Sequence, residues 1–90
     1  MILKIKDGFV VREILDSYMA VPVGERTRDV HGVIALNETG AFLWRMLEQD
    51  TSEDKLIASM VKEYEITEET AKDDIKEYLS FLREKGWLYD

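Results

Sequence analysis

The run of residues 36–47 constrains the fold of this chain more than any other stretch, because it describes a helix that is apolar on nearly every side. Asn37 is a favourable N-cap, since its side-chain oxygen can accept a hydrogen bond from a free N–H group of the first turn. Leu43, Trp44 and Leu47 then share one face, and further apolar residues cover a second. A helix that is hydrophobic on several sides is covered on several sides, so we expect this one to be the buried centre of the fold.

Gly40 lies inside this predicted helix, where glycine lowers helix propensity by about 1 kcal/mol relative to alanine. A glycine at such a position commonly has a packing reason. We therefore expect a neighbouring element to pack closely against the helix backbone at Gly40. The alternative interpretation is a helix that is buried for stability alone.

The first 36 residues are typical of a small antiparallel sheet. Segments rich in β-branched and aromatic residues alternate with turn residues such as Asp7-Gly8 and His31-Gly32. Short turns between strands favour antiparallel pairing. The sequence predicts strands over residues 9–14, 18–23 and 33–36.

Two further helices follow the apolar one. Thr51 is the expected N-cap of the second helix, which runs to about Tyr64, and Thr67 is the expected N-cap of the third. Gly86 follows basic residues and is typical of a helix C-terminus. Residues 87–89 form a short apolar end that we expect to fold back onto the core.

Ninety residues with 46% hydrophobic content are enough for one modest core, so we expect a single domain over residues 1–90. The order of elements predicts an α+β, winged-helix-like fold, a three-stranded antiparallel β-sheet followed by three α-helices. The chain has no cysteine, no apolar run near the roughly 20 residues of a membrane span and no signal-peptide pattern. We expect a cytoplasmic protein with no membrane partner, no metal and no cofactor.

The residues that could perform catalysis are few and scattered. His31, the single histidine, falls in a predicted turn with no apparent catalytic partner. Adjacent acids such as Asp73-Asp74 and Glu68-Glu69 diverge on a helix and cannot act as a carboxylate pair. Neither a phosphate-binding glycine-rich loop nor a calcium-binding loop occurs. We therefore expect a protein that is not an enzyme.

A winged-helix layout raises the alternative of a DNA-binding regulator, which would place a helix in the major groove. The charge distribution argues against it. Residues 37–90 carry 14 acids and 7 bases, and so the whole net charge of −7, and residues 67–85 of the third helix carry 6 acids and 4 bases. Phosphate contacts supply essentially all of non-specific affinity for nucleic acid, so we expect no nucleic-acid partner.

The run 36–47, with its Leu-Asn-Glu-Thr start, its tryptophan and its closing leucine, resembles the signature of the PqqD-like proteins. Residues 8–13 and 18–23 resemble the first two strands of that family, and residues 75–88 resemble its last helix and apolar end. Glu48-Gln49 stands where the family commonly has Asp-Gly, and no residue singles out the pyrroloquinoline quinone pathway.

The resemblance implies a non-catalytic module that binds the leader of a ribosomally made precursor peptide and presents the peptide to a modifying enzyme, often a radical SAM enzyme. In that family the peptide binds as an added strand beside the third strand, in a groove lined by the third helix. Main-chain hydrogen bonds at a sheet edge supply the affinity in this mode, and side-chain pockets supply selectivity. On this sequence the resemblance places the edge at Val33, Ile34, Ala35 and Leu36.

The third helix would form the other wall of that groove. Its core-facing stripe runs through Ala71, Ile75 and Leu82, so a ligand can reach only its flanks. The flanking residues that we expect to contact the peptide are Lys72, Lys76, Tyr78 and Leu79. The two lysines could pair with acidic leader residues, and a plain solvated helix face is the alternative.

Two further alternatives to peptide capture stay open at the level of sequence. A homodimer contact could cover the edge strand, or the domain could be a degenerate module retained as the partner of another protein. In either case the edge would be shielded from the aggregation that exposed strands promote.

Overall fold

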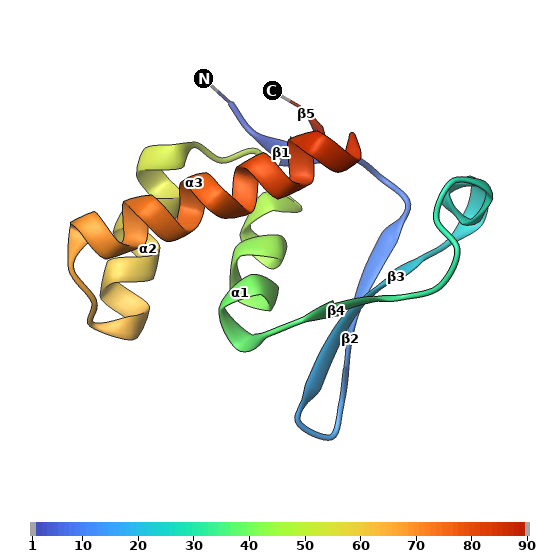
Figure 1. The fold of residues 1–90 in the computed structure, drawn as a ribbon, viewed down its shortest axis with the longest axis horizontal. Coiled ribbons are helices and arrows are strands. Elements are labelled where there is room, and N and C mark those ends of the chain that lie inside the picture. The colour runs from blue at the N-terminus through green and yellow to red at the C-terminus, as the bar shows by residue number, and fades with distance from the viewer. Residues whose placement is uncertain (1, 90) are drawn as a thin grey trace.

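A computed structural model describes residues 2–89, and the two ends of the predicted domain, Met1 and Asp90, lie outside the described residues. The chain has the predicted α+β architecture, in which a three-stranded antiparallel sheet precedes three helices (Figure 1). In chain order the elements are β1 (Lys4–Ile5), β2 (Phe9–Ile14), β3 (Ser17–Pro22), the 3-10 helix η1 (Gly24–Arg28), β4 (Ile34–Leu36), α1 (Glu38–Leu47), α2 (Glu53–Tyr64), α3 (Glu68–Lys85) and β5 (Leu88–Tyr89).

The three-stranded sheet has the order β2-β3-β4, and both neighbouring pairs are antiparallel. A two-residue turn at Leu15-Asp16 joins β2 to β3, and Leu15 adopts the positive φ of 58° that such a turn requires. β4 is one residue shorter than the predicted strand, because Val33 lies just before it. Within residues 2–89 β4 pairs with β3 alone and so forms one edge of the sheet.

The two ends of the described chain meet in a second, two-stranded sheet. β1 pairs with β5 in antiparallel fashion, with Ile5 opposite Leu88, and both side chains are buried. Gly86 makes this return possible, because it ends α3 with a φ of 79° in the left-handed region that glycine tolerates. The prediction that residues 87–89 fold back onto the core is confirmed for Trp87 and Leu88, whereas the Tyr89 side chain is exposed.

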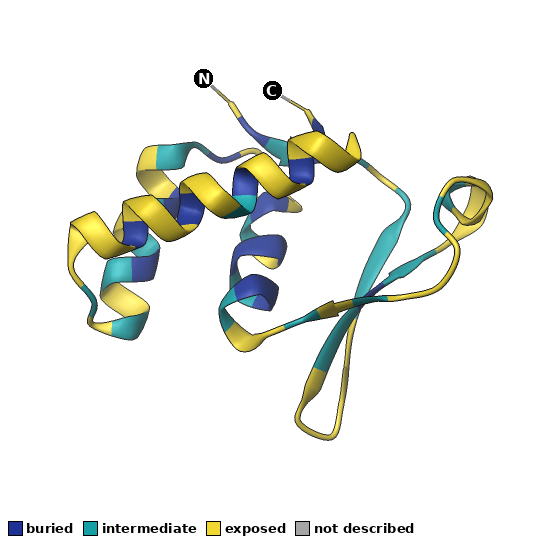
Figure 2. Cartoon of the chain, viewed as in Figure 1, coloured by how far each residue is buried: buried dark blue, intermediate teal, exposed yellow. Residues whose placement is uncertain are grey.

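Helix α1 is the centre of the core, as predicted. Trp44 and Leu47 are fully buried, and much of the α1 ribbon has the colour of buried residues (Figure 2). The Trp44 ring meets the Phe9 ring edge to face at a centroid distance of 5.3 Å and lies 6.3 Å from the Trp87 ring. Such aromatic pairs add stability beyond the area they bury. The indole N–H of Trp44 has no hydrogen-bond partner within residues 2–89.

The helix caps agree with the sequence at all but one position. The side chains of Asn37 and Thr67 accept hydrogen bonds from the backbone of their own first turns, as predicted. The prediction that Thr51 caps α2 is wrong, since Ser52 is the cap. Thr51 is instead buried, and its backbone N–H and C=O pair with those of Leu3 (3.0 and 2.8 Å), which holds it in the bridge to Leu3 one residue before the cap.

Arg26 anchors η1 to the start of the sheet. No sequence pattern around Arg26 predicts this contact. Its guanidinium donates two hydrogen bonds to the carbonyl of Asp7 (2.9 and 3.2 Å) and lies over the Phe9 ring at 5.4 Å. Gly8 allows the close approach, because a Cβ there would lie 2.7 Å from Cβ of Arg26. The segment that leads into β4 is thereby fixed at its beginning.

Candidate functional site

The hydrogen-bond pattern of β3 decides which backbone groups of β4 are free. Residues of an antiparallel pair alternate between opposite pairs that exchange hydrogen bonds and opposite pairs that do not. Val23 donates its N–H to the carbonyl of Gly8 at 2.8 Å, and in this register every second residue of β3 before it, Met19 among them, bonds to β2. The backbone groups of Tyr18 and Ala20 must therefore point toward β4.

Ala35 is the residue of β4 whose backbone groups face outward. Tyr18 lies opposite Leu36 and Ala20 lies opposite Ile34, so Ile34 and Leu36 use their backbone groups to bind β3. Ala35 lies between them, and its N–H and C=O point away from β3. Nothing within residues 2–89 pairs with this side of β4, so an extended chain can add to it.

The side chains of the predicted edge divide between two faces of the sheet. Ile34 and Leu36 are half-buried and pack against the core on the face that carries Ala20. Val33 and Ala35 are exposed, Val33 to 57%. The structure thus brings the four predicted edge residues together, with the free backbone groups at Ala35.

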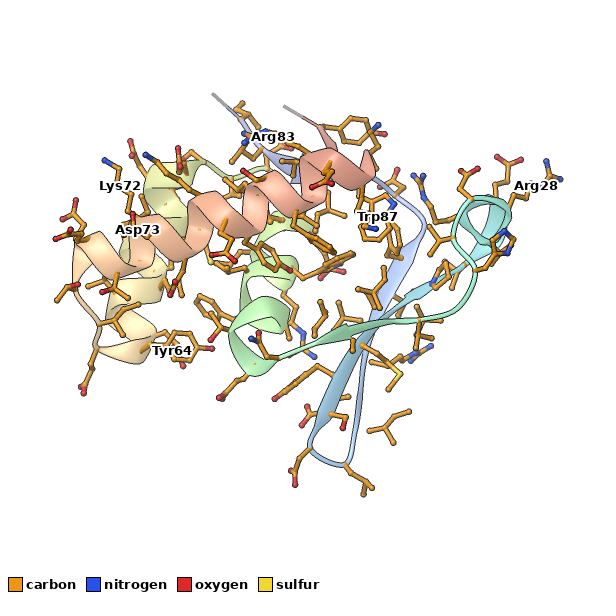
Figure 3. All side chains as sticks on the ribbon, viewed as in Figure 1. Arg28, Tyr64, Lys72, Asp73, Arg83 and Trp87 are labelled. Carbon is orange, nitrogen blue, oxygen red and sulfur yellow. The ribbon has the colours of Figure 1, made fainter. Side chains whose placement is uncertain are left out.

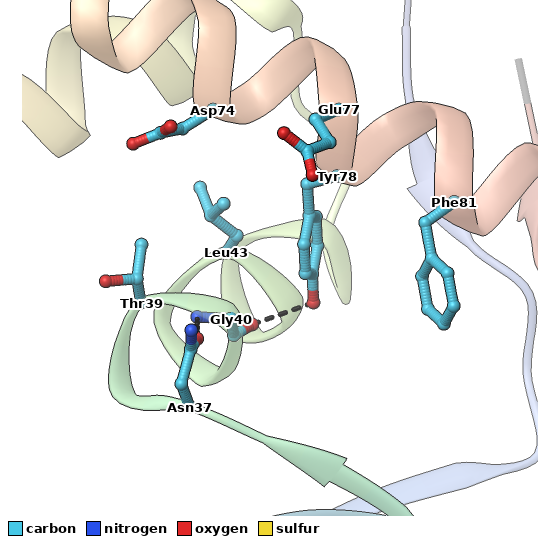
Figure 4. A pocket seen from close by; sticks show the side chains of 8 residues that line it. All are labelled: Asn37, Thr39, Gly40, Leu43, Asp74, Glu77, Tyr78 and Phe81. Atoms are coloured by element: carbon cyan, nitrogen blue, oxygen red, sulfur yellow. Dashed lines mark hydrogen bonds between the residues drawn. The ribbon is translucent and has the colours of Figure 1, made fainter.

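A pocket of about 440 Å³ lies between α3 and the junction of β4 with α1 (Figure 4). The first turn of α1 forms one side of the pocket and a flank of α3 forms the other. The Phe81 side chain is 40% exposed and adds an apolar surface. The lining residues are Asn37, Thr39, Gly40, Leu43, Asp74, Glu77, Tyr78 and Phe81.

Tyr78 joins the two sides of this pocket. Its hydroxyl donates a hydrogen bond of 2.8 Å to the carbonyl of Gly40, and its ring would lie 3.5 Å from a Cβ placed on that glycine. Burial raises the pKa of the Tyr78 phenol, so this group stays protonated and keeps donating. The same Cβ would come within 2.9 Å of Oδ1 of Asn37, the atom that caps α1. The expected close packing at Gly40 is confirmed.

The other predicted residues of α3 lie away from the pocket. Leu79 is 1% exposed and belongs to the core, so the prediction that it flanks the core stripe beside a ligand is wrong. Lys76 precedes Tyr78 by two residues, about 200° around the helix, and therefore points to the opposite flank. Lys72 lies one turn earlier on that flank, and Figure 3 shows it projecting away from the sheet. Among the four predicted residues of α3, only Tyr78 lines the pocket.

Three pocket residues of α3 escaped the sequence analysis, namely Asp74, Glu77 and Phe81. Asp74, Tyr78 and Phe81 recur at intervals of four and three residues, which places them on one helix flank. That spacing was a usable signal, but Asp74 was considered only as one of two adjacent acids, and Phe81 was not considered for the site. The flank that faces β4 is consequently acidic, and the basic flank faces away.

Several residues considered for chemistry stand apart from the pocket. His31 is exposed in the turn before β4 and does not line the pocket.

Within residues 2–89 no group of three His, Asp or Glu side chains is placed to hold a metal ion. No helix in the described part of the chain is long and apolar enough to cross a membrane.

Fold and site together define a winged-helix-like domain with an open strand edge beside a helical wall. The sequence model of the family described as coenzyme PQQ synthesis protein D (PqqD) matches residues 25–88, which is most of the chain. This chain therefore belongs to the PqqD family.

A solved structure, TbiB1 in complex with the TbiA(beta) leader peptide, has a similar fold, with a TM-score of 0.73. The two sequences are 22% identical over 97% of this chain and 98% of the other. The fold of the present chain is thus that of a protein whose structure was solved with a leader peptide bound. No curated protein matches the sequence significantly.

Proposed function

We propose that this chain is a non-catalytic module that captures the leader of a ribosomally made precursor peptide by strand addition to β4 and presents the peptide to a modifying enzyme. The observation that carries the proposal is the outward N–H and C=O of Ala35 on an unpaired edge, directly beside the pocket formed by α1 and α3. Membership of the PqqD family and the likeness to TbiB1, which was solved with a leader peptide, support it.

Strand addition fits the physics of this edge. An unpaired strand presents a template of donors and acceptors, and main-chain pairing with a peptide satisfies them without requiring a particular sequence. Selectivity must then come from side-chain contacts. The pocket of about 440 Å³, with Phe81 on its wall, supplies a place for them.

The partner enzyme is the part of the proposal that rests on family resemblance alone. A radical SAM enzyme or another peptide-modifying enzyme would receive the bound peptide. The genes beside that of this chain test the idea: a short peptide gene together with a radical SAM gene is the expected arrangement, and the absence of any peptide-modifying enzyme gene would count against it.

Two proline substitutions test the strand-addition mode, because each removes one backbone N–H. Ala35→Pro removes the outward donor and should abolish binding of a synthetic leader from the neighbouring precursor gene while leaving most of the fold intact. Ile34→Pro removes a donor that β3 uses and should destabilise the sheet itself. Fluorescence anisotropy measures the first effect, and urea unfolding measures the second.

Ala35→Val is the matched control, since it alters the same side chain but keeps the N–H and suits a strand. It should retain leader binding to within a few-fold. Full binding by Ala35→Pro would contradict strand addition at β4. If the parent without peptide elutes from size exclusion with the mass of a dimer and Ala35→Pro elutes with the mass of a monomer, a second copy of the chain covers this edge instead.

A further inference from the structure

The pocket beside β4 carries charge of one sign. Asp74 and Glu77 line it, and no lysine, arginine or histidine is among its lining residues. Both acids are exposed, and neither forms an ion pair within residues 2–89. Their two full charges outweigh the roughly half positive charge that the N-terminus of α1 contributes. The pocket is therefore a site of negative potential.

None of the four basic residues of α3, Lys72, Lys76, Arg83 and Lys85, lines this pocket. Lys72 projects away from the sheet (Figure 3), and Lys76 lies one turn further along the same flank of the helix. Lys85 does not line the pocket, and its Nζ lies 5.9 Å from the centroid of the Phe81 ring, at the C-terminal end of the helix. The negative potential is consequently concentrated where β4 ends and Asn37 begins α1.

We propose that the leader recognised by this chain carries a lysine or arginine just beyond the stretch that pairs with β4, on the side of Asn37, with its cationic group beside Asp74 and Glu77. The inference rests on the proposed function and adds to it the chemical class of the preferred leader. It reverses the sequence-based expectation of acidic leader residues, because that expectation relied on lysines that the structure places on the opposite flank.

Two properties of the pocket and the net charge of the whole chain favour a basic side chain. Tyr78 and Phe81 provide apolar surface for the aliphatic stem of lysine or arginine, whose charged head stays hydrated. A bound metal is disfavoured, since the described residues contain no group of three suitable ligands. The chain as a whole has a net charge of −7 and therefore attracts a basic peptide during encounter.

The position of the basic residue in the peptide also shows whether the peptide runs parallel or antiparallel to β4. A peptide antiparallel to β4 would carry it N-terminal to the paired stretch, because β4 runs toward Asn37. A parallel peptide would carry it on the C-terminal side.

A displayed library of random linear peptides, selected on the parent chain and on the variant Asp74→Asn/Glu77→Gln, tests this inference. The parent should enrich an extended apolar stretch with lysine or arginine at a fixed distance on one side. The variant should enrich the stretch without the basic residue. For a synthetic peptide from the parent selection, replacing its basic residue by glutamine should weaken binding about three- to tenfold on the parent, as expected for partly exposed ion pairs, and should change little on the variant.

The variant Glu69→Gln/Asp73→Asn is the matched control, because it removes the same charge from α3 outside the pocket. It should enrich the same basic position as the parent. The inference is overturned if basic residues have no fixed position in peptides selected on the parent. It is also overturned if the variant Asp74→Asn/Glu77→Gln selects the same basic position. Neither result contradicts strand addition at β4. A parent that selects no peptide, or selects peptides that bind Ala35→Pro equally well, contradicts the proposed function as well.

Discussion

Helix α1 and strand β4 are neighbours in the sequence, yet α1 is largely covered by the rest of the chain, whereas β4 has an open edge. In α1 the first turn is capped by Asn37, and apolar neighbours cover the side chains on several sides. In β4 the backbone groups of Ala35 have no partner within residues 2–89, and its side chain is exposed. The family signature at residues 36–47 therefore describes mainly the scaffold, while Ala35, the residue with the free backbone groups, comes immediately before it.

Gly40 marks the point where scaffold and site meet. Its carbonyl accepts the hydrogen bond from Tyr78, a pocket residue, and its missing Cβ leaves room for the Asn37 cap. A change at this position alters both the helix start and the pocket wall. The contrast between α1 and β4 can consequently be tested by substitutions on each side of this boundary.

The largest effect is expected in the core of α1. Trp44→Ala removes a fully buried side chain that packs against Phe9 and Trp87, and should lower the free energy of unfolding by about 3–5 kcal/mol. Such a loss is comparable with the whole stability of a small domain. A urea melt followed by circular dichroism measures it.

Two controls sharpen this prediction. Trp44→Phe keeps most of the apolar volume and removes an indole N–H that lacks a partner within residues 2–89, so it should cost much less than the alanine variant. Phe81→Ala alters a 40% exposed aromatic residue and should also cost less. A Trp44→Ala protein with the parent's midpoint would show that α1 is not the organising centre.

A smaller effect is expected where Tyr78 contacts α1. Tyr78→Phe removes the hydrogen bond to Gly40 and should lower the free energy of unfolding by about 0.5–1.5 kcal/mol near neutral pH. Tyr89→Phe, at an exposed tyrosine, is the control and should change stability less.

The same variant has a predicted pH dependence. Burial places the pKa of folded Tyr78 above its ordinary value of 10.0, so the unfolded state loses the proton first. This contribution to stability is fully present below that ordinary value and is lost as the pH rises above it. Tyr78→Phe should therefore flatten the loss of stability above about pH 10, apart from a remainder due to Tyr64, whose pKa is also raised by burial. An equally steep decline in the variant would contradict this assignment.

The smallest effect concerns Gly40 itself. Alanine should gain about 1 kcal/mol of helix propensity, but its Cβ would press on the Asn37 side chain and so displace a cap of similar value. Gly40→Ala alone should therefore leave stability nearly unchanged or lower it. In an Asn37→Ala background the same substitution should become stabilising, and a double-mutant cycle of urea melts measures the coupling. Additive effects would show that the two residues do not compete for space.

The sequence was most informative about helix caps, strand bounds and the buried helix, where local patterns allow few alternatives. Asn37, Thr67 and Gly86 take their predicted cap positions, and residues 9–14 form a strand with the predicted bounds. The apolar helix could be placed at the centre because its apolar residues lie on several of its faces, and most of them are buried. These are local signals, and tertiary structure did not override them.

The site was harder to predict, because it depends on how α3 is rotated about its axis. An amphipathic stripe fixes which face of a helix is buried, but not which flank faces a strand distant in sequence. Lys72 and Lys76 were therefore predicted to contact the peptide although they do not line the pocket, whereas Asp74 and Glu77, which line it, were not among the predicted residues. Long-range backbone contacts explain the remaining misses, since the pairing of Thr51 with Leu3 and the anchoring of Arg26 at Asp7 leave no periodic pattern.

Hydrogen exchange at Ala35 tests the central claim most directly. In the free protein the Ala35 amide should exchange rapidly, whereas the amides of Ile34 and Leu36 should be protected by β3. Addition of the leader peptide to ¹⁵N-labelled protein should protect Ala35 and shift its amide resonance, with further shifts at Tyr78 and Phe81. Saturating peptide that leaves residues 33–36 unchanged, with shifts confined to residues 9–14 or 25–29, would contradict strand addition at β4 however tight the binding.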